Sequence, residues 1–415
     1  MSETVETVTF GQPQRLSEDS ETGDEHEVPD SGPVAPVAEF TEPGQSKLGK
    51  RSLSADSDDD EPEAKRAAGE HTTVVATHYN QIEERGLAER NRSRIFYMRN
   101  FNNWVKSILI NKYLAMVKGK ASLGTPLRVM DMCCGKGGDL LKWLKGNITH
   151  LICTDIAEIS VKQCEERYKK MTPMNDGKLF TAEFITADAT LQQLRTKFKD
   201  PSLKLHLVSC QFAFHYSFES LKQAERMMKN AAECLQEGGY FIGTIPDANE
   251  IMKRQRAAGS DCFGNDVYKI TLLCDTETPP LFGAKYNFQL DGVVDCPEFL
   301  VHFPTLEKLA RKLGLRLVEK KRFDECYEES IGSWQPLIEK MQALETFPSH
   351  SHYDRERQQN QPEQYAHVQQ FYDRNGRCKL GTLSLQEWEA STLYLFFAFQ
   401  KMKTQWDAKG NAVYS

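Results

Sequence analysis

Polar side chains stand within two residues of the ends of three short apolar runs between residues 150 and 211. These are Asp155, Asp188 and Gln211, after residues 150–154, 182–186 and 205–209. If the runs are parallel strands, these side chains meet at the sheet edge where open α/β folds bind ligands. Asp155 could then accept both ribose hydroxyls of an adenosine, Asp188 suits the adenine amino group, and Gln211 suits the amino-acid part of a cofactor. Each aspartate could instead cap the following helix.

A glycine-rich turn precedes these side chains. Gly135, Gly137 and Gly138 let the backbone turn tightly and approach a ligand closely. By itself such a turn fits NAD, FAD or S-adenosylmethionine. The context favours the last, because Asp131 stands before the glycines and Leu140 occupies the place of the third glycine in the dinucleotide fingerprint.

The elements that must position these residues alternate between strand and helix patterns. This alternation predicts an α/β fold with an open, doubly wound, mostly parallel sheet. A basic amphipathic helix is expected at 93–116, with Phe101, Trp104 and Ile108 on its apolar face. Seven strands are expected, at residues 127–132, 150–154, 182–186, 205–209, 240–244, 315–318 and 393–398.

Two regions differ from this pattern. Residues 323–380 form a polar stretch too long for a simple loop, which predicts an insertion lobe with a helix at 334–344. Residues 1–75 contain only two aromatic side chains and many acidic and small ones, which predicts a disordered tail before a folded domain of residues 76–415.

Charge separates the tail from the rest of the chain. Residues 1–70 hold 6 of the 52 Lys and Arg residues and 18 of the 59 Asp and Glu residues, so an acidic tail precedes a mildly basic body. Two basic pairs interrupt the acidic tail, Lys50-Arg51 and Lys65-Arg66, and their separation predicts a bipartite nuclear import signal for an import receptor. The other interpretation is ordinary solvated charge.

Several classes of protein are disfavoured. The apolar run 393–399 is far shorter than the ~20 residues that span a bilayer, so no membrane association is expected. The eleven cysteines contain no CxxC pair, which favours reduced thiols over a disulfide framework or a zinc site. The sequence therefore predicts a nuclear protein without a metal.

Within residues 93–400 the chain closely resembles the eukaryotic mRNA cap guanine-N(7) methyltransferases, a family of class I S-adenosylmethionine-dependent methyltransferases with a Rossmann-like fold. The matching segments are FNNWVKS (101–107), CGKGGDLLKW (134–143), CTDIA (153–157), FITAD (184–188), CQFAFHYSFES (210–220), GGYFIGT (238–244), VVDCPEFLVHFP (293–304) and SLQEWEASTLYLFFAF (384–399). The resemblance implies methyl transfer from S-adenosylmethionine to nitrogen 7 of a GpppN-RNA cap, with S-adenosylhomocysteine as product.

The same resemblance implies two groups of site residues. Those implied to contact S-adenosylmethionine are Lys106, Cys133, Asp155, Asp188, Gln211 and Tyr216. Those implied to contact the capped RNA are Asn102, Asn103, Lys136, Lys142, Arg167, His215, Glu298 and Tyr394. Cys133 departs from the family, which usually has glycine there, and a positive φ at this position would cost about 1 kcal/mol.

The chemistry of the cap residues agrees with these roles, although each has an alternative. Lys136, Lys142 and Arg167 suit the anionic triphosphate bridge, but each alone could be a solvated charge. Glu298 can pair with the Watson–Crick edge of guanine, or it can be a glutamate in the first turn of a helix. Tyr394 and His215 could equally be structural.

No catalytic acid or base is expected, because nitrogen 7 of guanine loses no proton on methylation. The resemblance also implies association with the capping machinery and with a small RNA-binding activating subunit. Two rival functions stay open at this stage: methylation of a small molecule on the same fold, and an inactive RNA-binding scaffold.

Overall fold

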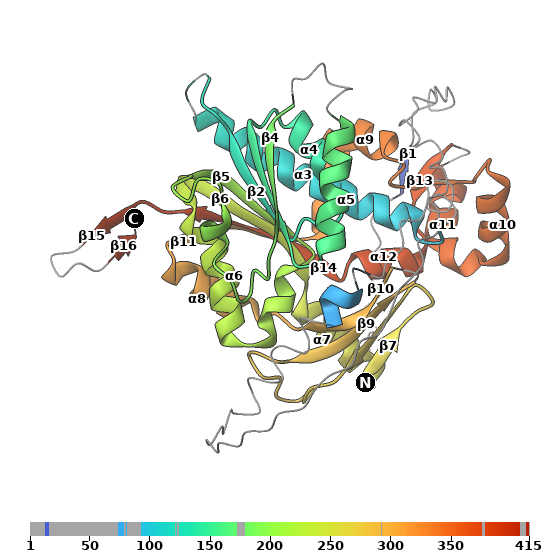
Figure 1. Cartoon of the computed structure of the whole chain (residues 1–415). Helices are drawn as coiled ribbons and strands as arrows, with labels where there is room; N and C mark the ends of the chain where they lie inside the picture. The colour runs from blue at the N-terminus through green and yellow to red at the C-terminus, as the bar shows by residue number, and fades with distance from the viewer. Residues whose placement is uncertain are drawn as a thin grey trace, which may run out of the picture.

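The computed structural model describes residues 13–15, 74–78, 80, 93–120, 122, 124–171, 179–291, 293–375, 378–406 and 412–414. Its central feature is a seven-stranded sheet in the order β11-β14-β6-β5-β2-β3-β4 (Figure 1). The strands are β2 (Arg128–Met132), β3 (His150–Asp155), β4 (Thr181–Thr186), β5 (Leu205–Gln211), β6 (Leu235–Pro246), β11 (Leu315–Arg322) and β14 (Tyr394–Lys401). The five from β6 to β4 are parallel, and β14 and β11 are antiparallel additions at one edge. The predicted mostly parallel seven-stranded sheet is confirmed.

Alternate residues of the central strands enter two separate cores. Val129, Leu151 and Leu207 face one core, whereas their neighbours Met130, Ile152 and Val208 face the other. A sheet that is buried on both faces needs apolar residues at every position, which is why these strands are continuous apolar runs.

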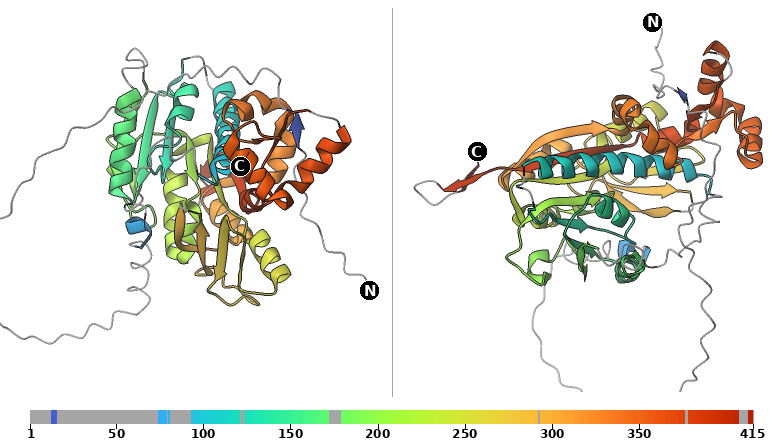
Figure 2. Two further views of the ribbon diagram at one scale, coloured as in Figure 1. Left: turned by 90° about the vertical axis from the view of Figure 1, so that its right-hand side faces the viewer. Right: turned by 90° about the horizontal axis from the view of Figure 1, so that it is seen from above.

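Helices cover both faces of the sheet. The first core is closed by α3 (Phe96–Lys120), α4 (Leu140–Lys145) and α5 (Glu158–Met171). The second is closed by α6 (Leu221–Glu233) and α8 (Phe303–Lys312). Figure 2 shows α3 running along the sheet, as its predicted apolar face requires. α7 (Ala248–Ala258) packs with a third core that lies toward the second sheet.

A second sheet, which the sequence did not predict, lies against the first. It is antiparallel in the order β10-β9-β8-β7, and its strands are β7 (Cys262–Gly264), β8 (Tyr268–Leu272), β9 (Lys285–Leu290) and β10 (Val294–Phe299). Glu298 lies on β10 opposite Tyr286, so the alternative of a helix-start glutamate is wrong.

The insertion of residues 323–380 is largely helical and lies at the opposite end of the molecule from the hairpin of β15 (Thr404–Trp406) and β16 (Ala412–Tyr414) (Figure 1). Its first helix begins eleven residues before the predicted start at 334 and bends at Trp334, two residues before Pro336, so the predicted helix 334–344 is wrong in its bounds. In chain order the elements of the insertion are this first helix, α9 (Phe323–Lys340), then β12 (Glu345–Phe347), α10 (His352–Asn360), η5 (Pro362–Tyr365), α11 (Ala366–Asn375) and β13 (Leu380–Thr382). α12 (Leu385–Ser391) follows the insertion.

Two parts of the predicted disordered tail are structured. β1 (Gln14–Arg15) pairs with β13, and the carbonyl of Arg15 accepts a hydrogen bond from Gln335 at 2.8 Å. Residues 74–78 and 80 are helical. The prediction of disorder is therefore wrong at residues 14–15 and 74–75, whereas residues 76–78 and 80 belong to the predicted folded domain. Composition does not show that a short segment can pair with an exposed strand edge. The import signal at Lys50, Arg51, Lys65 and Arg66 lies outside the described residues.

Candidate functional site

A cavity of about 320 Å³ opens where β2, β3 and β5 end. All six residues predicted to contact the cofactor line it: Lys106, Cys133, Asp155, Asp188, Gln211 and Tyr216. Its position at the carboxyl ends of the parallel strands is the ligand-binding position of this fold. Val75, from the helical residues before α3, also lines the cavity, and no sequence signal pointed to it.

Asp155 is held by the backbone around it. Its two carboxylate oxygens accept hydrogen bonds from the N–H groups of Gly135, at 2.8 Å, and of Ala157, at 2.9 Å. Neither bond caps a helix, because α5 begins at Glu158, so the helix-cap alternative is wrong for Asp155. Each carboxylate oxygen can accept a second bond, so Asp155 can still receive two ribose hydroxyls. Burial raises the pKa of this carboxyl, and the backbone N–H groups oppose that shift.

Asp188 and Gln211 offer further polar groups to the cavity. One oxygen of Asp188 accepts hydrogen bonds from the N–H and hydroxyl groups of Thr190. The side-chain N–H of Gln211 donates to Ser209 at 2.9 Å. Its oxygen is buried and has no hydrogen-bond partner among the described residues, so a donor on a ligand would satisfy it.

The turn after β2 has the backbone geometry that its glycines suggested. φ is 51° at Gly135 and 76° at Gly137. Cys133, which carries a Cβ atom, also has a positive φ of 61°, so the expected strain is present in the structure.

A buried carboxylate that the sequence analysis missed organises three of the predicted residues. Asp139 lies 2.9 Å from Lys106 and 2.7 Å from Lys142, and Lys142 also contacts Asn103. Burial alone would raise the pKa of Asp139, but the two lysines outweigh it and hold the pKa below its usual range. Its place in the segment CGKGGDLLKW, three residues before Lys142, was the available signal.

A second group of polar side chains surrounds Glu298, which is buried. Tyr286 donates a hydrogen bond of 2.6 Å to one of its oxygens, and the Tyr216 hydroxyl lies 3.5 Å from the other. His215 Nε2 is 3.3 Å from the latter oxygen. The angles there do not make a hydrogen bond, and within the described chain both ring nitrogens of His215 are buried without a partner. Tyr286 was not predicted, because its strand was not.

The Glu298 group adjoins the cavity. Tyr216 lines the cavity and reaches Glu298, and Phe212 lines the cavity and contacts Tyr394 edge-on, with ring centroids 5.0 Å apart. Tyr394 is half-buried among Phe288 and Phe323 as well. The structure thus brings His215, Glu298 and Tyr394 next to the cofactor residues.

Three predicted cap residues lie outside this arrangement. Lys136 is half-buried in the β2–α4 turn but does not line the cavity. Arg167 is exposed on α5, well along the helix from the cavity. Asn102 lies on α3, and its buried side-chain oxygen has no hydrogen-bond partner in the part of the chain that is described. Their roles stay predictions.

No helix in the described part of the chain has the length and apolar character needed to cross a membrane.

Comparisons with known proteins agree with this geometry. The model of the mRNA (guanine-N(7))-methyltransferase domain matches residues 62–402. The chain is 54% identical to the mRNA cap guanine-N(7) methyltransferase of Drosophila melanogaster, over 83% of this chain and 80% of that protein. It is 41% identical to that of Caenorhabditis elegans, over 80% and 88%, and 35% identical to methyltransferase 1 of Oryza sativa subsp. japonica, over 79% and 80%. The chain therefore belongs to the mRNA cap guanine-N(7) methyltransferase family.

Proposed function

We propose that this enzyme transfers a methyl group from S-adenosylmethionine to nitrogen 7 of the terminal guanosine of GpppN-RNA, and that it does so in the nucleus as a step of mRNA capping. One observation carries the proposal: the cavity lined by all six cofactor residues shares Tyr216 with the group around Glu298. Donor and acceptor would therefore meet at Tyr216 and Phe212.

The cavity fits S-adenosylmethionine by its donors and acceptors. Asp155 would receive the ribose hydroxyls, Asp188 the adenine amino group, and the unpartnered oxygen of Gln211 the ammonium of the methionine part. Lys106 would act through its pair with Asp139, which fixes α3 against the start of α4. The bound sulfonium supplies an electrophilic methyl group.

Glu298 would hold the guanine edge. Its oxygens accept from Tyr286 and lie near Tyr216, and their remaining lone pairs can accept the ring N–H and the exocyclic amino group. Positive charge develops on the purine as nitrogen 7 is methylated. The buried carboxylate therefore pairs better in the transition state than in the ground state, which is the kind of binding that raises kcat.

No residue of the site has to move a proton. The chain's contribution is alignment of nitrogen 7 with the methyl group and exclusion of water, for which the aromatic rings of Phe212, Tyr216 and Tyr394 are placed. Lys142 would offer positive charge to the triphosphate bridge, with Lys136 and Arg167 farther out. An enzyme that methylates a small molecule would not need Glu298 or these cations, which argues against that rival function.

Methyl transfer from radiolabelled S-adenosylmethionine to GpppA- and GpppG-capped RNA tests this function. Label on capped RNA, none on RNA that already carries the methylated cap, and none on uncapped RNA would support it. An inactive scaffold predicts no label and no thermal stabilisation by S-adenosylhomocysteine. Label on small molecules alone would support the small-molecule rival.

Nuclear import and protein partners form a separate part of the proposal. Truncation of residues 1–73, which keeps Val75, should leave cap methylation in vitro within about twofold, since none of the described residues of that segment, 13–15, lines the cavity. Nuclear accumulation should fall in the truncated protein. Replacing Lys50, Arg51, Lys65 and Arg66 by alanine should reproduce that fall, because the import receptor would no longer bind. Persistent nuclear accumulation in that variant would show that these four residues are not the import signal.

The capping machinery and a small RNA-binding activating subunit are proposed as partners on the basis of the family resemblance.

A further inference from the structure

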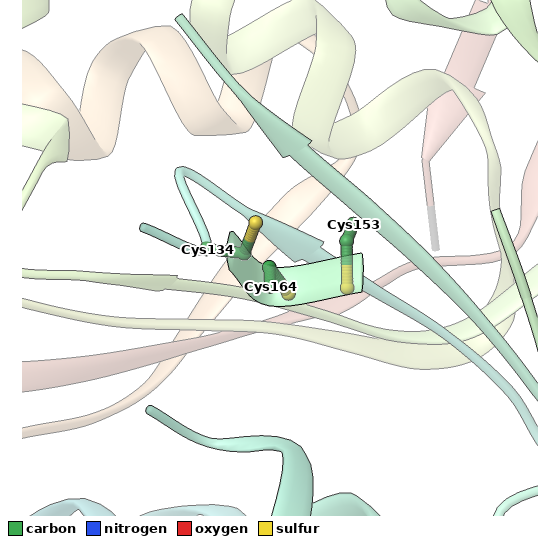
Figure 3. A group of neighbouring side chains, drawn as sticks. All are labelled: Cys134, Cys153 and Cys164. Carbon is green, nitrogen blue, oxygen red and sulfur yellow. The ribbon is translucent and has the colours of Figure 1, made fainter. Parts of the chain in front are cut away.

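Three cysteines that are far apart in the sequence meet beneath the cofactor cavity. Cys134 comes from the turn after β2, Cys153 from β3 and Cys164 from α5, and their sulfur atoms all lie within 4.8 Å of one another (Figure 3). No short cysteine motif joins them, and for that reason the sequence favoured reduced thiols over a zinc site.

The fold itself holds the three thiols together. β2 and β3 are neighbouring parallel strands, and the N–H of Cys134 donates to the carbonyl of Thr154 at 2.9 Å. Cys153 and Cys164 belong to the same buried core. A Cβ atom at Gly137 would come within 2.8 Å of the Cys164 sulfur, so the glycine leaves space for that thiol.

We propose that Cys134, Cys153 and Cys164 form a three-thiolate site for one thiophilic cation of the Zn²⁺ class, and that an ion there excludes the methyl donor. Thiolates select zinc and other soft cations. Zn–S bonds of about 2.3 Å in a tetrahedral site place the sulfur atoms about 3.8 Å apart, so binding requires a contraction of no more than about 1 Å. The ion is not a cofactor of methyl transfer.

The cavity gives the cluster a route of entry. Cys134 lines the cavity, whereas Cys153 and Cys164 are buried behind it, so an ion would arrive through the cavity and keep a water from it as fourth ligand.

Binding at the cluster would disturb the cofactor site through one residue. Cys134 stands between Cys133 and Gly135, and the N–H of Gly135 donates to Asp155. Drawing the Cys134 sulfur toward an ion moves this turn, so bound cation and bound S-adenosylhomocysteine should compete. The competition rests on the proposed function, whereas binding of the cation does not.

Cadmium and zinc salts added to the reduced full-length protein test the site. Titration with Cd²⁺ should give a thiolate-to-cadmium ultraviolet band that saturates at one ion per chain. The band should be lost in Cys164→Ser and kept in Cys262→Ser, which removes an exposed thiol outside the cluster. Equal loss in both variants, or no loss in Cys164→Ser, would overturn the proposal.

If the Cys164→Ser variant fails to fold, a measurement on the wild-type protein still tests the site. X-ray absorption at the zinc edge, with one Zn²⁺ per chain, should show three sulfur neighbours; a shell of nitrogen and oxygen alone would overturn the site. One equivalent of Zn²⁺ should weaken binding of S-adenosylhomocysteine by about tenfold or more. If three sulfurs are found but S-adenosylhomocysteine binding is unchanged, the site stands and its exclusion of the donor is wrong.

Discussion

The cofactor end and the guanine end of the site are built in different ways. Asp155 and Gln211 are the last residues of β3 and β5, Asp188 lies two residues after β4, and strand order alone brings them together. The guanine end depends on Glu298 and Tyr286, which lie opposite each other in a separate antiparallel sheet. Tyr216 and Phe212 belong to both ends. In the proposed function, the parallel sheet would thus supply a general nucleotide site, and the added sheet would supply the group that selects a base.

The largest effect is expected from Asp155→Ala, which removes the acceptor for both ribose hydroxyls. Hydrogen bonds to a charged group contribute about 1.5–3 kcal/mol, so affinity for S-adenosylhomocysteine should fall roughly tenfold to a hundredfold by calorimetry. The melting temperature should fall as well, because Gly135 and Ala157 lose their acceptor. Asp200→Ala is the matched control, since Asp200 also accepts from a nearby N–H but lies in an exposed turn. Unchanged affinity in Asp155→Ala would show that Asp155 does not bind the cofactor.

Glu298→Gln tests whether the two ends are separable. It replaces one acceptor by a donor that faces the donors of guanine, and it removes the charge that accompanies the purine cation. Turnover of GpppG-capped RNA should fall about tenfold or more, with affinity for S-adenosylhomocysteine nearly unchanged. Asp295→Asn, the same change on the same strand, should keep wild-type turnover. A Glu298→Gln enzyme with normal kcat/KM would end the guanine-reading role.

A smaller, salt-dependent loss is expected from Lys142→Ala. Affinity for capped RNA should fall several-fold, and the slope of its salt dependence should flatten by about one, because one phosphate contact is lost. Lys106 keeps Asp139 paired in this variant, so the fold should persist. Lys145→Ala on the same helix should change neither quantity, since that side chain is exposed and pairs with no cavity residue. If the slope of the salt dependence is unaltered in Lys142→Ala, Lys142 makes no phosphate contact and only pairs with Asp139.

Cys133→Gly should produce the smallest change, and a favourable one. A side chain at a positive φ costs about 1 kcal/mol of backbone strain, and glycine avoids this cost. Cofactor affinity or thermal stability should therefore match or exceed that of the wild type. Calorimetry and thermal unfolding measure the two. A clear loss of affinity would show that the cysteine side chain itself contacts the cofactor.

The same contrast explains what the sequence could reveal. The seven strands and the polar residues Asp155, Asp188 and Gln211 were predictable because each strand is a local apolar run and each of these residues stands beside its end. Lys106, Cys133 and Tyr216 were implied by the family resemblance alone. Asp139 and Tyr286 were missed because their roles depend on pairing with residues distant in the chain, Lys106 and Glu298. The pairing of Arg15 with Leu380 and the meeting of three cysteines depend on the same kind of long-range contact.

The most direct test of the account is a crystal structure of the protein with S-adenosylhomocysteine and a GpppA cap analogue bound together. The account predicts ribose hydroxyls on Asp155, the guanine edge on Glu298, and nitrogen 7 facing the sulfur across the junction of Phe212 and Tyr216. A guanine bound away from Glu298, or with nitrogen 7 turned from the sulfur, would contradict it.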